Sequence, residues 1–135
     1  MKEKKTYITI NPSATIHGDI RDYEKSLNEL GFNEAFVFVE YPLDTLLVNY
    51  AIRKNGRIEL VDSPVEEQVP CGLEVYRDKK HYSKNTDFNI NKLEAILKIS
   101  PVGIIVPSKK WAKKLEDKIK DLRYDFKRVS YWRLF

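Results

Sequence analysis

Two short runs of the chain are apolar at every position, and they constrain its fold more than any other feature. Residues Ala35 to Val39 read Ala-Phe-Val-Phe-Val, and residues Val102 to Val106 read Val-Gly-Ile-Ile-Val. An extended strand with no polar side chain on either face is typical of a sheet that is covered on both sides. The two runs therefore predict buried strands in a sheet with helices packed on it.

Further segments have the composition of strands and turns. The pair Asn55-Gly56 is favoured in a tight type I′ turn, so it predicts a hairpin between its flanking segments. Asp62 to Pro70 reads as an acidic loop, and Asp78 to Asp87 reads as a polar loop with few apolar residues. The other segments predicted as strands are Thr6 to Ile10, Thr45 to Arg53, Arg57 to Val61, Leu73 to Arg77 and Phe126 to Phe135.

Apolar residues at helical spacing predict three helices. The first opens at Asp19 and ends at Gly31, the second runs from about Asn91 to Ile99 before Pro101, and the third runs from Lys109 to Leu122. A chain of 135 residues is long enough for one hydrophobic core. We therefore expect a single α/β (α+β) domain over residues 1–135, with one mixed sheet of about six to seven strands flanked by three helices.

Positive charge is concentrated at the carboxyl end of the chain. Residues 109–135 hold ten basic and four acidic side chains, whereas the remaining residues hold 14 basic and 16 acidic ones. Like charges that act together raise the local concentration of ions of opposite sign. This asymmetry indicates a surface for an anionic partner.

The predicted third helix carries its lysines on one side. Its apolar residues fall on one half of the helical projection and its lysines fall on the other. Cations in the first turn are unfavourable beside the positive end of the helix dipole, and a bound phosphate would remove that penalty. Ser108 is also a favourable N-cap. The predicted anion-binding residues here are Ser108, Lys109, Lys110, Lys113 and Lys114.

The predicted final strand mixes cations with flat rings, which suits a single-stranded backbone with stacked bases. Its candidate contacts are Arg128, Tyr131, Trp132 and Arg133, with Lys79 and Lys80 as outlying candidates. Our leading hypothesis is a small nucleic-acid-binding protein that contacts the phosphate backbone and performs no catalysis. It needs no cofactor.

A second hypothesis is a stoichiometric protein-binding inhibitor, of the immunity-protein kind, that docks on an acidic protein surface. Exposed Tyr, Trp and Arg side chains are the usual anchors of such interfaces. A lone cysteine, Cys71, excludes an intrachain disulfide, so we expect a cytoplasmic protein. No apolar run is long enough to cross a bilayer, so no membrane partner is expected.

A third hypothesis is a divergent metal-dependent nuclease. Asp62 and Glu74 lie on or beside two consecutive predicted strands, as the metal-binding carboxylates do in nucleases of the PD-(D/E)xK type, with Glu59 as an additional candidate ligand. Such an enzyme would require Mg²⁺. Tyr76 stands where these nucleases have a lysine. His81, in a basic loop, is a further candidate for acid–base catalysis, and neither histidine has zinc-ligand spacing.

Overall fold

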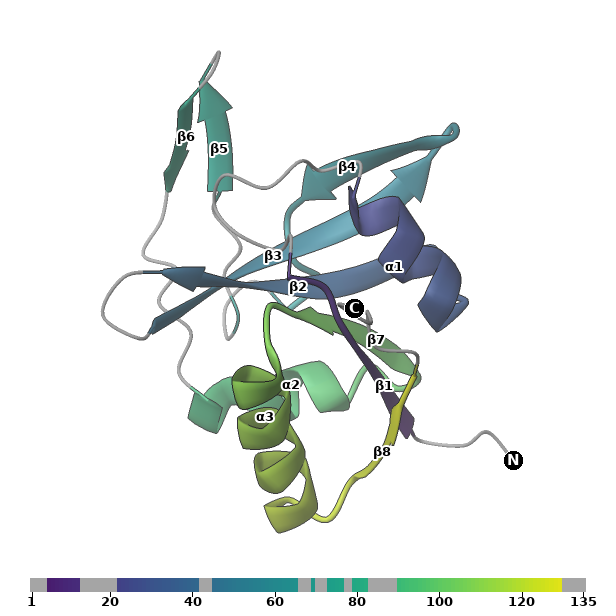
Figure 1. Cartoon of the computed structure of the whole chain (residues 1–135), viewed down its shortest axis with the longest axis vertical. Coiled ribbons are helices and arrows are strands. Elements are labelled where there is room, and N and C mark those ends of the chain that lie inside the picture. Colours follow the sequence, from purple (N-terminus) through teal and green to yellow (C-terminus); the bar gives the residue numbers. More distant parts are fainter. Residues whose placement is uncertain are drawn as a thin grey trace.

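In the computed structural model of the chain, the described residues are 5–12, 22–41, 45–65, 69, 73–76, 79–82 and 90–129. They form a six-stranded sheet with helices on both faces, and a separate two-stranded sheet (Figure 1). The predicted architecture, one mixed sheet flanked by three α-helices, is confirmed.

The six-stranded sheet has the order β4-β3-β2-β7-β1-β8. Strands β2, β7, β1 and β8 are parallel, and β3 and β4 extend the sheet in antiparallel pairing. The strand bounds are β1 (Lys5–Ile10), β2 (Glu34–Tyr41), β3 (Thr45–Lys54), β4 (Arg57–Val61), β7 (Val102–Val106) and β8 (Asp125–Arg128).

The two fully apolar runs occupy the middle of this sheet. They form the cores of β2 and β7, which pair with each other, and Phe36 registers with Ile104. All five residues of each run are buried. The prediction from their composition is therefore confirmed, because only central strands are covered on both faces.

The helices lie on opposite faces of the sheet (Figure 1). Helix α1 (Asp22–Leu30) packs with Val37 and Ile105, whereas α2 (Leu93–Leu97) and α3 (Lys109–Asp121) pack on the other face with Ile8 and Ile104. A short 3₁₀ turn, Ile90–Lys92, precedes α2. The second helix is thus shorter than predicted.

Polar contacts fix the helices in place. The Asn11 side-chain amide donates to Ser26 Oγ at 2.9 Å, which links the end of β1 to α1. On the other face, the Tyr124 hydroxyl donates to Glu94 of α2. Burial and the neighbouring Glu94 carboxylate raise the pKa of Tyr124 above its ordinary value, which favours the protonated hydroxyl that donates to Glu94.

The predicted hairpin is confirmed. Asn55 and Gly56 join β3 to β4 with φ values of +52° and +73°, the left-handed conformations that a type I′ turn requires. The prediction of a loop from Asp78 onward is wrong over Lys79–Tyr82. These residues form β6, which pairs with β5 (Leu73–Tyr76) and stands apart from the main sheet in Figure 1.

The predicted final strand corresponds to β8 up to Arg128, and residues 130–135 of that prediction lie outside the described residues. Tyr131, Trp132 and Arg133 lie outside the described residues. Among the helices that the structure describes, none has the length and hydropathy to cross a bilayer.

Candidate nucleic-acid interface

Helix α3 separates apolar from basic residues as its sequence predicts. Its buried side includes Trp111, Leu115 and Ile119, which pack against the sheet. The opposite side presents four exposed lysines in the first turn and a half of the helix, and we call this group the α3 lysine face. Its members are Lys109, Lys110, Lys113 and Lys114.

The amino end of α3 is capped by Ser108, as predicted. Ser108 has an extended backbone conformation, and its hydroxyl oxygen accepts a hydrogen bond from the Trp111 backbone N–H at 3.3 Å. This contact satisfies one of the amide groups that a helix start leaves without an intrahelical partner. The cap therefore fixes where the α3 lysine face begins.

The sheet topology places this helix start at a distinctive point. Strands β1 and β7 are parallel neighbours, and the Asn11 N–H donates to the Val106 carbonyl at 2.8 Å where the two strands end. Helix α1, the next described element after β1, lies on one face of the sheet, and α3, which follows β7, lies on the other. In open α/β sheets, ligands bind outside the carboxyl ends of the strands where connections diverge in this way. The α3 lysine face borders that position.

Carboxylates neutralise part of the α3 lysine face. Lys110 Nζ lies 3.9 Å from Glu40 Oε2 at the end of β2, and Lys113 Nζ lies 3.9 Å from Asp117. Within the described part of the chain, Glu40 and Asp117 thus each lie close to one lysine of the group. Both ion pairs are largely exposed, so each contributes little to stability and is weakened by salt.

Trp111 anchors the start of α3 to β2. Its indole N–H donates to Glu40 Oε2 at 3.0 Å. Lys110 Nζ and Lys114 Nζ lie 5.2 Å and 4.6 Å from the centre of the indole ring, within the range of cation–π attraction. Because Trp111 is only 7% exposed, its ring positions the two lysines and is not itself a contact surface.

Arg128 differs from Lys110 and Lys113, because a buried carboxylate accepts hydrogen bonds from two nitrogens of its guanidinium. Arg128 Nε donates to Glu116 Oε2 at 2.8 Å, and a second guanidinium nitrogen donates to Glu116 Oε1. Glu116 is buried, whereas about half of the Arg128 side chain is exposed. This bidentate ion pair connects β8 to α3, so Arg128 has a structural role that its sequence position did not indicate.

We expect Arg128→Ala to lower the free energy of unfolding by about 1–2 kcal/mol, because it leaves the buried Glu116 carboxylate without its partner. The exposed half of Arg128 keeps the loss below that of a fully buried pair. Urea unfolding measures the change. Lys113→Ala, at an exposed pair on the same helix, is the matched control and should cost less than about 0.5 kcal/mol. Equal losses in both variants would contradict the structural role of Arg128.

The candidate metal ligands Asp62 and Glu74 are placed at different sheets. Glu59 lies on β4 and the exposed Asp62 follows it, whereas Glu74 and His81 lie opposite each other on β5 and β6 of the separate sheet. Strand β4 pairs with β3 and not with β5. Within the described ranges, no cluster of three or more His, Cys, Asp or Glu side chains is arranged to hold a metal ion.

Comparison with known proteins adds no assignment: no protein-family model, curated protein or solved structure matches this chain.

Proposed function

We propose that this protein binds nucleic acid without catalysis, through the phosphate backbone and mainly through the α3 lysine face. The observation that carries the proposal is the clustering of four exposed lysines at the capped start of α3, beside the point where the connections of β1 and β7 diverge. Phosphate groups there would meet both the lysines and the positive end of the helix dipole.

The position of the lysines also supports the proposal energetically. The helix dipole makes each lysine charge in the first turn unfavourable by about 0.3–1 kcal/mol. Glu40 and Asp117 offset part of this penalty. A bound phosphate backbone would reduce this penalty further, because it brings several negative charges along one helix face.

The competing hypothesis of a protein partner draws less support from the described residues. Protein interfaces depend on exposed aromatic and arginine anchors. Near the α3 lysine face, however, Trp111 is buried and Arg128 is bound to Glu116. Lysine is depleted at the centres of protein interfaces but common in phosphate contacts. Tyr131, Trp132 and Arg133 remain predicted contacts of the proposed nucleic acid.

The test is the dependence of affinity on salt. If each lysine of the α3 lysine face contacts one phosphate, log K should fall against log salt concentration with a slope of about −2.8 for single strands and −3.6 for duplexes. Fluorescence anisotropy with labelled DNA and RNA oligonucleotides, measured from low to high salt, gives both slopes. An affinity that does not change with salt would refute the proposal.

A further inference from the structure

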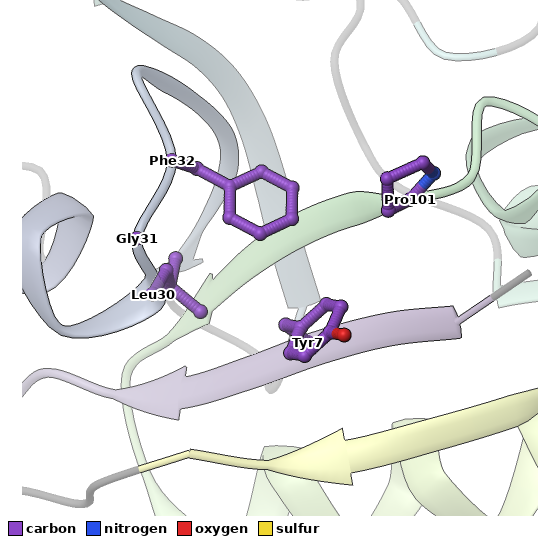
Figure 2. A pocket seen from close by; sticks show the side chains of 5 residues that line it. All are labelled: Tyr7, Leu30, Gly31, Phe32 and Pro101. Carbon is purple, nitrogen blue, oxygen red and sulfur yellow. The ribbon is translucent and has the colours of Figure 1, made fainter. Parts of the chain in front are cut away.

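A concave surface lies on the α1 side of the sheet, opposite the side that α3 covers. It is a groove of about 480 Å³ near the amino ends of β1 and β7, lined by Tyr7, Leu30, Gly31, Phe32 and Pro101. Figure 2 shows the rings of Tyr7, Phe32 and Pro101 arranged around one opening. The groove therefore presents flat, largely apolar walls to its occupant.

The backbone after α1 fixes one wall of the groove. Gly31 adopts φ +77°, and its N–H bonds to the Asn28 carbonyl at 3.2 Å, while the Phe32 N–H bonds to the Leu27 carbonyl at 3.1 Å. These bonds form the Schellman motif that ends many helices. Phe32 is thus held in place before any ligand arrives.

The sheet fixes the opposite wall. Tyr7 lies on β1 between β7 and β8, and its ring centre is 5.5 Å from that of Phe32 at an angle of 52°. Gly103, which registers with Tyr7, has no side chain to fill the space beneath: a Cβ there would lie 3.1 Å from Leu30 and 3.5 Å from Phe32. The two aromatic rings are half-buried, so each keeps part of its surface for contact.

The polar groups at the groove favour an anion. Lys127 lies beside the groove and is not one of its lining residues: it is exposed, and it registers directly with Tyr7 on the neighbouring strand β8, on the same face of the sheet. The Tyr7 hydroxyl has no hydrogen-bond partner within the described part of the chain. None of the lining residues carries a carboxylate. Aromatic walls beside a cation fit a flat ring that bears a negative group.

We propose that this groove binds a nucleotide, with the base against Tyr7, Phe32 and Pro101 and the phosphate at Lys127. A free mononucleotide and a nucleotide within a single strand share this chemistry. The proposal does not rest on the α3 lysine face, which lies on the other side of the sheet.

The test uses the whole chain labelled with ¹⁵N and titrated with AMP, adenosine and ribose 5-phosphate, followed by NMR. We expect AMP to shift the amide signals of Tyr7, Gly31 and Phe32, adenosine to shift them at higher concentration, and ribose 5-phosphate to leave them unchanged. Absence of shifts with millimolar AMP would overturn the proposal, as would equal shifts with ribose 5-phosphate.

Two variants locate the contacts. Tyr7→Leu keeps an apolar side chain on β1 but removes the stacking surface, and should weaken AMP binding about tenfold. Lys127→Gln changes an exposed residue, and should weaken AMP several-fold while leaving adenosine unaffected. AMP affinities equal to wild type in both variants would overturn the assignment.

Two further experiments distinguish a free mononucleotide from a single strand as the ligand, and the groove from the α3 lysine face as the binding site. Tighter binding of a six-nucleotide oligomer than of AMP, lost in Tyr7→Leu, would identify a single strand as the ligand, and equal affinities would identify a free mononucleotide. A variant with all four lysines of the α3 lysine face replaced by Gln should still bind AMP at the groove. Loss of AMP binding in that variant would overturn an independent site.

Discussion

Replacing Lys109, Lys110, Lys113 and Lys114 together by Gln is expected to weaken nucleic-acid binding about a thousandfold at 0.1 M salt. Each phosphate contact contributes about 0.7–0.9 to the slope of log K against log salt concentration, so four lost contacts remove about three logarithmic units at this salt concentration. The slope itself should fall close to zero if no other contacts exist. Fluorescence anisotropy across a salt series measures both quantities.

The fold should tolerate this change. All four side chains are exposed, and removing cations from the first turn of α3 relieves an unfavourable interaction with the helix dipole. We therefore expect a change in unfolding free energy within about 0.5 kcal/mol for each substitution.

A matched control separates a specific surface from overall charge. Four exposed lysines lie elsewhere on the chain: Lys25, Lys54, Lys92 and Lys98. Replacing these four by Gln changes the net charge of the chain by the same amount as replacing the α3 lysine face. This control should lose less than about tenfold in affinity, because long-range charge effects are screened at 0.1 M salt. Equal losses in the two quadruple variants would show that net charge alone drives binding, contrary to the proposal.

Gly103→Val is expected to lower the free energy of unfolding by about 3 kcal/mol. Gly103 lies in the centre of the sheet on β7, where even a Cβ would meet Leu30 at 3.1 Å and Ala35 at 3.5 Å. Valine adds two methyl groups beyond that position, and overpacking of a fixed core costs about 1–3 kcal/mol or more. The same clash would displace Phe32 and deform the groove.

Urea unfolding of a short series tests this reasoning. Gly103→Ala should cost about 1 kcal/mol, since one neighbouring side chain must move by a few tenths of an ångström. Ile104→Val, at the next position but on the other face of β7, should cost about 0.5–1.5 kcal/mol by deleting one methyl group. A Gly103→Val protein as stable as the wild type would show that α1 and Phe32 can move away from β7.

Local sequence patterns predicted the elements whose structure is determined by residues close together in the chain. The apolar runs at residues 35–39 and 102–106 identified the central strands, and Asn55-Gly56 identified the hairpin between β3 and β4. Helical spacing and the Ser108 cap also gave the start and the two sides of α3 correctly. In each case neighbouring residues along the chain determine the structure.

Patterns could not reveal contacts that depend on strand order. Glu116 has the composition of a solvated helix residue, yet β8 brings Arg128 against it. Glu40 lies 71 positions before Trp111 and meets it only because β2 and β7 are neighbours. The groove was missed for the same reason, since its walls come from β1, the end of α1 and the residue before β7. The strand Lys79–Tyr82 was missed because its polar sequence resembles a loop.

The pairing of β8 with β1 also has a consequence for the chain during translation. Lys5 registers with Asp125, 120 positions later, so β1 leaves the ribosome long before the strand that completes its outer edge. Until then, that edge exposes unpaired amide and carbonyl groups from Lys5 to Ile8, and an unpaired strand edge can pair with another chain. The nascent chain is thus open to association along this edge until β8, the last of the described strands to emerge, pairs with β1.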